Sequence, residues 1–207
     1  IYRNFIDGAG PRAIGVGYHE GLNLAFDANN MRLAMIWHGE FINGARHWIA
    51  RGQGFQPPAG NDVLRLPEGL AIAKLNSSDS SWPESEYRTK ELAFGGYVLD
   101  KMQRPTFKYS RNKVSITDKA IPIADTSEGI PGKIKRLIRF SAKEGPTNLY
   151  FRIAEGNFEK KDDSFQNEEL VVRVKGGDAF THEDELRVPI VFNGKTAQLE
   201  ITYSWAE

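Results

Sequence analysis

Alternation of apolar and polar residues is the feature that most constrains the fold of this chain. It is clearest over residues 196–205, where five apolar side chains face one way and the polar ones face the other. Side chains in a β-strand point to opposite faces in turn, so a period of two indicates a strand with one buried face. The Asn193-Gly194 pair before this run is the strongest two-residue hairpin turn in the chain.

Short runs of this kind recur along the sequence, separated by turns rich in Gly, Asn, Asp and Pro. Roughly a dozen such runs follow one another at the spacing typical of all-β proteins, and no long helix is expected. The clearest hairpin joins residues 91–100 to 104–110, and two short strands are expected at 113–117 and 120–123. Residues 31–38 also alternate, with Leu33, Met35 and Trp37 expected on one face. One-sided alternation favours antiparallel sheets packed face to face. The sequence therefore predicts an all-β, mostly antiparallel β-sandwich, extended or built of two sub-sheets.

A single domain spanning residues 1–207 fits a chain of this length, with a division into two sub-sheets near residues 76–88 as an alternative. Residues 41–50 fit a helical turn as well as an irregular strand, and residues 176–185 are interpreted as an acidic loop. Pro189 lies inside a predicted strand, which indicates an edge strand or a bulge, because proline cannot donate a ladder hydrogen bond. Residues 133–142 also alternate, but Arg136 occupies an inward position. We therefore expect it to be a buried charge.

The charge balance argues against two classes of partner. Lys and Arg together number 27, as do Asp and Glu, so the net charge is zero. A nucleic-acid binder normally carries a basic surplus, and a membrane-surface protein a basic amphipathic helix. No apolar run approaches the roughly 18 residues of a membrane span. We therefore expect neither nucleic-acid binding nor membrane insertion. The absence of cysteine excludes disulfides and thiolate metal sites within this chain.

Two segments carry a resemblance to known proteins. They are YRNFIDGAGPRAIGVGY, continuing through LNLAFDANNMRLAMIWHGEFINGARHW and RGQGFQPP, and FGGYVLD followed by RPTFKY. They resemble a region of large multidomain proteins of planctomycete and verrucomicrobial type that also contain a c-type cytochrome domain. The resemblance covers residues 2–110 and implies an extracytoplasmic setting and a haem domain elsewhere in a longer parent chain. It implies no functional residues, and this chain lacks the CxxCH haem motif.

The densest group of aromatic and basic residues indicates where a ligand would bind. Sugar sites place an aromatic face against the ring, with Arg, His or Asp around it. The glycines at 52–54 would allow close backbone approach, so we expect the site near Trp48 and not near Asn193-Gly194. The simpler interpretation is that Trp37 and Trp48 are core residues, because buried aromatic side chains dominate sandwich cores, and the alternation favours the core for Trp37 in particular. The predicted ligand-binding residues are Arg12, His38, Arg46, His47, Trp48 and Arg51.

Metal and cofactor sites are weakly supported by the residue spacing. His38 and His47 are nine residues apart, which is not the spacing of a typical zinc site. Residues 27–30 lack the glycine and glutamate positions of an EF-hand loop, and the acidic run at 181–185 is interpreted as a solvated loop. No motif for nucleophilic catalysis is present. We therefore predict no metal, no cofactor and no catalytic residues.

Three functions follow as hypotheses, in order of preference. The first is a non-catalytic ligand-binding or docking module, with carbohydrate as the preferred ligand. The second is a carbohydrate-active enzyme of mutarotase-like type that uses His and Glu in acid–base chemistry. The third is a structural module that packs on a cytochrome domain.

Overall fold

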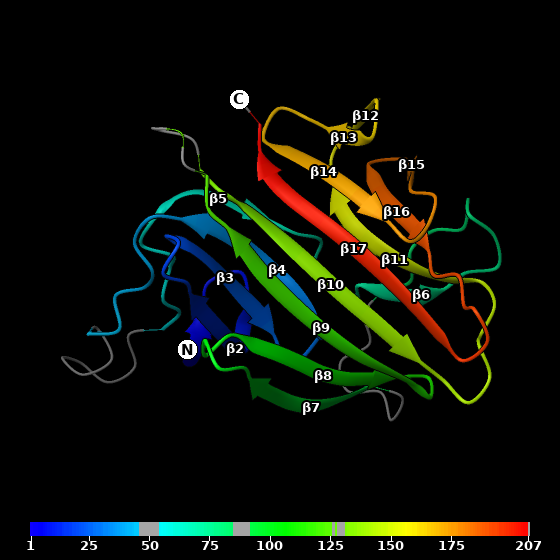
Figure 1. Cartoon of the computed structure of the whole chain (residues 1–207), viewed down its shortest axis with the longest axis horizontal. Coiled ribbons are helices and arrows are strands. Elements are labelled where there is room, and N and C mark those ends of the chain that lie inside the picture. Colours follow the sequence, from blue (N-terminus) through cyan, green and yellow to red (C-terminus); the bar gives the residue numbers. More distant parts are fainter. Residues whose placement is uncertain (46–53, 85–91, 126, 128–130, 207) are drawn as a thin grey trace.

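A computed structural model (Figure 1) describes residues 1–45, 54–84, 92–125, 127 and 131–206. Within these ranges the chain forms strands and no helix, and all pairings between named strands are antiparallel. The prediction of an all-β, mostly antiparallel sandwich is confirmed. The described part of the chain contains no helix long and apolar enough to cross a membrane.

The strands form three sheets. The first has the order β1 (Tyr2–Ile6), β2 (Gly10–Gly17), β3 (Leu22–Asp27), β4 (Arg32–His38) and β5 (Asn61–Arg65). The second has the order β12 (Glu159–Lys161), β13 (Ser164–Gln166), β14 (Leu170–Lys175), β17 (Thr196–Trp205), β10 (Lys133–Ser141), β9 (Val114–Ile123), β8 (Pro105–Arg111) and β7 (Leu92–Leu99). The third has the order β15 (Phe180–His182), β16 (Glu185–Pro189), β11 (Leu149–Glu155) and β6 (Ile72–Lys74).

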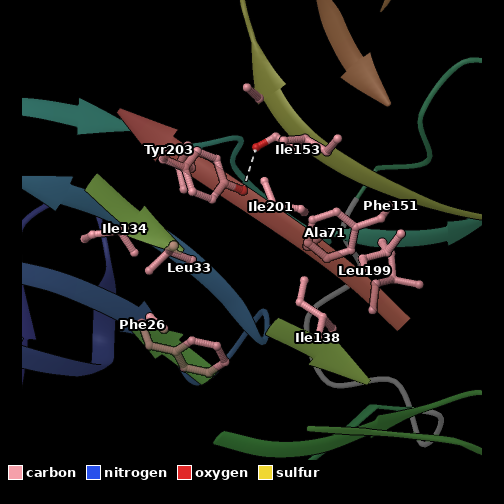
Figure 2. Close-up of a cluster of buried hydrophobic side chains, with 14 of the residues drawn as sticks. Phe26, Leu33, Ala71, Ile134, Ile138, Phe151, Ile153, Leu199, Ile201 and Tyr203 are labelled. Atoms are coloured by element: carbon pink, nitrogen blue, oxygen red, sulfur yellow. Dashed lines mark hydrogen bonds between the residues drawn. The ribbon is translucent and has the colours of Figure 1, made fainter. Parts of the chain in front are cut away.

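The second sheet forms one layer of the sandwich, and the first and third sheets lie behind it in the view of Figure 1. The main core lies between the layers and contains side chains from all three sheets (Figure 2). Phe26 of the first sheet stacks on Phe107 of the second with ring centroids 4.1 Å apart. The hydroxyl of Tyr203 donates a hydrogen bond to the carbonyl of Ile153 in the third sheet, at 3.5 Å. Apolar burial between the layers is therefore the main stabilising term.

The alternation of β17 and β10 agrees with the structure. In β17 the predicted inward residues are buried, except that Trp205 stays partly exposed at the end of the strand. Arg136 of β10 is buried, as its break in the pattern indicated, and its Nε donates to Asp118 at 2.8 Å. Burial alone would lower the pKa of Arg136, but the attraction of Asp118 raises it overall. The charge inside this core is therefore paired.

Strand β4 departs from the predicted alternation because of a β-bulge at Ala34. Phe26 pairs with Leu33 and Ala25 pairs with Met35, so one extra residue lies in β4. Leu33 consequently joins the main core, whereas Met35 belongs to a second cluster on the other face of the first sheet. Both faces of β3 and β4 are thus covered, and the prediction that Leu33 and Met35 share a face is wrong.

Three further expectations need correction. The predicted acidic loop at 176–185 contains β15, which pairs with β16. The strand with Pro189 is not an edge strand over its whole length, since β15 pairs with residues 185–187. Pro189, its last residue, is nevertheless paired on one side only within the described ranges, with Tyr150 of β11, as the missing N–H of proline requires. Residues 113–123, predicted as two strands, contain the single strand β9. Residues 41–45 form neither helix nor strand, and the division predicted near 76–88 falls partly on residues outside the described ranges.

Candidate functional site

The predicted ligand-binding residues fall into two groups. Arg46, His47, Trp48 and Arg51 lie outside the described residues. Arg12 and His38 are described, but they lie at opposite ends of the first sheet. Arg12 is beside the end where Asp27 pairs with Arg32, whereas His38 pairs with Leu22 at the other end. The length of β4, about 20 Å at the usual rise per residue, separates them, so the structure does not bring these two side chains together.

Trp37 is a core residue, as the alternation favoured. Its side chain is fully buried, and its indole nitrogen donates to the carbonyl of Glu40 at 2.9 Å. Its ring lies parallel to that of Phe41, with centroids 6.0 Å apart. The indole N–H is satisfied inside the protein, so Trp37 is not available to a ligand.

His38 lies in a cleft at one end of the first sheet, which we call the His38 cleft. It has a volume of about 1040 Å³ and is lined by residues of β4, β5, β10, β13, β14 and β17. One end of the first sheet, at His38 and β5, therefore meets one end of the second sheet around this cleft. Its lining includes His38, Asp62, Lys133, Gln166, Ser204 and Trp205.

His38, Asp62 and Trp205 contact one another at the wall of this cleft. The Nε2 atom of His38 is 2.7 Å from Oδ2 of Asp62, and the side chain of Asp62 is 66% exposed. The rings of His38 and Trp205 meet edge to face at 5.3 Å. The indole nitrogen of Trp205 donates to the backbone carbonyl of Asp62 at 2.6 Å. The three side chains are thus held in fixed orientations while Trp205 and Asp62 stay accessible.

The cleft bends round the end of β17 onto the outer face of the second sheet, opposite to the side that Trp205 faces, and a row of four residues, three of them polar, lines it there. Lys133 pairs with Ser204, Ser204 pairs with Val171, and Val171 pairs with Gln166. Residues directly opposite each other on neighbouring strands face the same side of a sheet, so these four side chains share one face. Among the described residues, the side chains of Lys133, Ser204 and Gln166 make no hydrogen bond or ion pair. Their donors and acceptors are therefore available to solvent or to a ligand.

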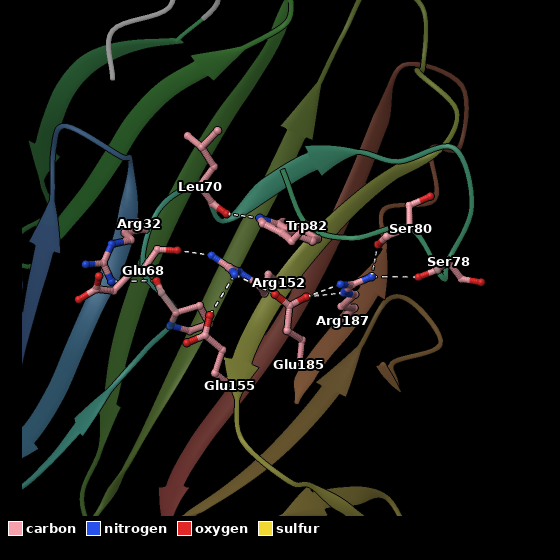
Figure 3. Close-up of polar contacts among 11 residues, drawn as sticks. Arg32, Glu68, Leu70, Ser78, Ser80, Trp82, Arg152, Glu155, Glu185 and Arg187 are labelled. Carbon is pink, nitrogen blue, oxygen red and sulfur yellow. Dashed lines mark hydrogen bonds and ion pairs between the residues drawn. The ribbon is translucent and has the colours of Figure 1, made fainter. Parts of the chain in front are cut away.

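The second cleft, which we call the arginine cleft, has a volume of about 880 Å³ and lies where the first and third sheets meet. Arg32, Arg152 and Arg187 form a row along it (Figure 3). Arg152 and Arg187 are register partners on β11 and β16, so both side chains project from one face of the third sheet. All three side chains are at most 10% exposed. Charges this deeply buried require partners.

Most of those partners are groups of the protein itself. The three guanidinium groups donate to six backbone carbonyl oxygens, which belong to Gly8, Leu66, Pro67, Glu68, Ser78 and Ser80. Glu185 bridges the two arginines of the third sheet: its Oε1 accepts from Arg152 at 2.8 Å and its Oε2 from Arg187 at 2.6 Å. The arrangement fastens segments 66–70 and 78–82 to the sheets.

Trp82 covers the arginine pair. The guanidinium carbons of Arg152 and Arg187 lie 5.2 and 5.5 Å from its ring centroid. Its indole nitrogen donates to the carbonyl of Leu70 at 2.8 Å. Such cation–π contacts are attractive, and more so when the cation is shielded from water. The polar groups of Trp82 and of the arginines are therefore largely engaged within the fold.

Two pKa shifts reflect the electrostatic cost of the arginine cleft. Burial lowers the pKa of Arg32, and the attraction of Asp27, 3.5 Å away, offsets this only in part. Burial also raises the pKa of Glu155, although its carboxylate lies 3.0 Å from Arg152. Repulsion from Glu185 adds to that rise. The ion pair with Arg152 therefore does not fully compensate for placing the Glu155 carboxylate here.

Several residues of the His38 cleft were not identified as site residues from the sequence. Trp205 was assigned to the scaffold because regular alternation indicates a buried face. Asp62, Lys133 and Gln166 lie far from His38 in sequence, and only the packing of the sheets brings them to it. The terminal position of Trp205 in its strand was the one available signal, since a side chain at a strand end can stay exposed.

The described residues contain no group of three or more His, Cys, Asp or Glu side chains that could hold a metal ion. Comparisons with protein families, with curated proteins and with solved structures found no match to this chain. The resemblance to cytochrome-containing multidomain proteins therefore stays a prediction, and the function has to be argued from the two clefts.

Proposed function

We propose that this protein is a non-catalytic module that binds a carbohydrate in the His38 cleft. The observation that carries the proposal is that Lys133, Ser204 and Gln166 have no hydrogen-bond or ion-pair partner among the described residues and line the same cleft as the partly exposed ring of Trp205. Binding sites for small molecules combine an aromatic or apolar surface with a few placed polar groups. An ammonium, a hydroxyl and a carboxamide together offer both donors and acceptors, which suits a ligand rich in hydroxyl groups.

The geometry favours an elongated ligand. The four register partners from Lys133 to Gln166 lie on four adjacent strands. With neighbouring strands about 4.8 Å apart, the row spans about 14 Å. A chain of sugar units lying along the row could bond to Lys133, Ser204 and Gln166 on the outer face of the sheet. A terminal unit that bends round the end of β17 would reach Trp205, which faces the inner side. The fixed His38 and Asp62 side chains would lose little conformational entropy on binding, which favours affinity.

A second candidate, an enzyme of mutarotase-like type, is supported by one contact. The 2.7 Å contact between His38 and Asp62 holds an imidazole beside a carboxylate, the arrangement that a general base uses. Conversion of one sugar anomer into the other, followed by polarimetry, would distinguish this enzyme from a binding module. The third hypothesis, a structural module beside a cytochrome domain of an extracytoplasmic parent chain, rests on the sequence resemblance alone.

The experiment that tests the proposal begins with a glycan array, followed by calorimetric titration of the glycans that bind. We expect Lys133→Ala and Gln166→Ala each to weaken binding, because each removes a hydrogen-bonding group from the row. Lys195→Ala is the matched control, since Lys195 is an exposed lysine at the far end of β17. If no glycan binds, or if Lys195→Ala weakens binding as much as Lys133→Ala, the proposal is wrong.

A further inference from the structure

Strand β7 is an open edge of the second sheet (Figure 1). Among the described residues it pairs with β8 alone. It is eight residues long and contains no charged side chain. Val98 is 48% and Leu99 is 43% exposed. A long, neutral edge strand with exposed apolar residues is a template for pairing with another strand.

The opposite edge of the same sheet is built differently. Strand β12 has three residues, Glu159, Lys160 and Lys161, and all are charged and exposed. Short length and charge are two of the means by which proteins prevent edge-to-edge pairing. The contrast between the two edges indicates that only β7 is suited to a partner strand.

The sequence of β7 is close to a palindrome, which points to a second copy of the same strand as the partner. It reads LAFG from one end and LVYG from the other. When two copies pair antiparallel about an axis between the two glycines, residues of similar size come together. The cross-strand pairs are Leu92–Leu99, Ala93–Val98, Phe94–Tyr97 and Gly95–Gly96.

A regular strand could not pair in this way. A two-fold axis perpendicular to the sheet maps the upper face of one copy onto the upper face of the other. Two residues that lie directly opposite each other across the axis must therefore face the same side of the sheet. In β7 the paired positions, such as 94 and 97, are an odd number of residues apart. In a regular strand, residues an odd number apart face opposite sides of the sheet. Such a palindrome would therefore place inward side chains against outward ones.

The bulge in β7 removes this obstacle. Phe94 pairs with Tyr109 and Tyr97 with Phe107, so β7 has one extra residue between Phe94 and Tyr97. Because Tyr109 and Phe107 are two residues apart on β8, Phe94 and Tyr97 face the same side. Both pack against the main core. The two halves of β7 are thus related by the symmetry that self-pairing requires.

The glycines at the centre make the bulge sterically acceptable. Gly96 has a φ of +89°, a conformation that glycine adopts without strain. A Cβ atom on Gly95 would lie 3.2 Å from the carbonyl oxygen of Lys108. No side chain at these two positions would separate two opposing strands at the axis.

We propose that β7 pairs antiparallel with β7 of a second copy of this chain, about a two-fold axis between Gly95 and Gly96. The pairing joins two eight-stranded sheets into one continuous sheet, with main-chain hydrogen bonds across the axis. Within Leu92–Leu99 self-pairing brings no like charges together, because the strand contains no charged residue. The surface is separate from the His38 cleft, so the proposal is independent of the proposed function.

The test uses two double variants at Ala93 and Val98, which are exposed and would face each other across the axis. In Ala93→Lys with Val98→Lys, both cross-strand pairs become like-charged. In Ala93→Glu with Val98→Lys, both become oppositely charged. Sedimentation equilibrium of the wild type should give twice the chain mass of 23.3 kDa. We expect the double-lysine variant to raise the dimer dissociation constant by about tenfold or more and the mixed-charge variant to leave it nearly unchanged.

Three results would overturn the proposal: a monomeric wild type at high micromolar concentration, a double-lysine variant as dimeric as the wild type, or loss of the dimer in both variants. Circular dichroism checks that each variant is folded. Amide hydrogen exchange of the wild type gives a second measurement that needs no variant. Exchange along β7 should slow as the protein concentration rises, and exchange that does not depend on concentration contradicts the pairing.

Discussion

The arginine cleft and the His38 cleft both place charged side chains beside a tryptophan, but those side chains have different partners. In the arginine cleft the guanidinium groups are buried and bind backbone carbonyls and Glu185. In the His38 cleft, Lys133 and Gln166 make no hydrogen bond or ion pair with other described residues. Volume does not distinguish the two, at about 880 and 1040 Å³. What distinguishes a structural cleft from a candidate binding cleft here is whether the polar groups are already bonded.

The largest expected effect is the loss of stability in Arg187→Ala. This change leaves the Oε2 atom of Glu185 and the carbonyls of Ser78 and Ser80 without the donor that Arg187 provides, although Oε1 keeps its bond from Arg152. Breaking a buried ion pair in this way costs about 3–5 kcal/mol. Urea denaturation monitored by fluorescence measures the loss. Arg173→Ala is the control, because its ion pair with Asp163 is exposed, and it should cost less than about 1 kcal/mol. If both variants lost the same free energy of unfolding, the arginine cleft would not be more important for stability than an exposed ion pair.

The next effect in size concerns ligand affinity. Trp205→Ala should weaken binding of a carbohydrate that the array identifies by about tenfold, or about 1.4 kcal/mol, the upper part of the range for an aromatic contact. Calorimetry gives the dissociation constant, and a thermal melt shows that the variant is folded. Unchanged affinity in a folded variant would show that Trp205 does not contact the ligand.

A smaller effect distinguishes the carboxylates of the two clefts. Burial, followed by repulsion from Glu185, raises the pKa of Glu155 in the folded state. Because the pKa of Glu155 is higher in the folded state, protonation of this side chain stabilises the fold. The stabilisation is complete below the unfolded-state pKa of about 4.3, and it is lost as the pH rises through the folded-state pKa. Glu155→Gln should therefore be as stable as the wild type at pH 7 or more stable, by less than about 1 kcal/mol because the side chain is partly exposed.

Urea denaturation at pH 7 and at pH 3.5 measures this prediction, and the advantage of Glu155→Gln should shrink at the lower pH. Glu168→Gln is the control, an exposed glutamate of the His38 cleft that makes no ion pair with another described residue. A clear loss of stability in Glu155→Gln at pH 7 would show that the ion pair with Arg152 outweighs the burial of the carboxylate.

The smallest expected effect is that of metal removal. Exhaustive chelation should leave the melting temperature unchanged, since neither the sequence nor the described residues provide a group of metal ligands. Differential scanning fluorimetry with and without EDTA measures this. A fall of several degrees that Ca²⁺ or Zn²⁺ restores would show that an ion stabilises the folded state.

The strands of this chain could be predicted where alternation is undisturbed, as in β17 and β10. The bulge at Ala34 could not, because it is defined by the pairing of β4 with β3 and not by the residues of β4 alone. Strand β15 was missed for a similar reason: three residues in an acidic stretch become a strand only because β16 lies beside them. Local pattern predicts strands, whereas register depends on contacts distant in sequence.

The candidate site was predictable only in part. His38 was identified from its aromatic and basic neighbours, and it lines one of the two clefts. Trp205 contacts Asp62 from 143 residues away, a proximity that no local pattern contains. The arginine cleft was missed because Arg152 and Arg187 come together only through the register of β11 and β16. The predictions for Arg46, His47, Trp48 and Arg51 await a measurement that reports on them.

The indole N–H signals in a ¹H–¹⁵N NMR spectrum provide the most direct test of the difference between the clefts. The four tryptophans, Trp37, Trp48, Trp82 and Trp205, give one indole signal each. On titration with a glycan from the array, the signal of Trp205 should shift, while those of Trp37 and Trp82 stay in place. A shift of Trp48 as well would support the site predicted from the sequence. A shift of Trp82 with Trp205 unmoved would contradict the account, because the ligand would then occupy the arginine cleft.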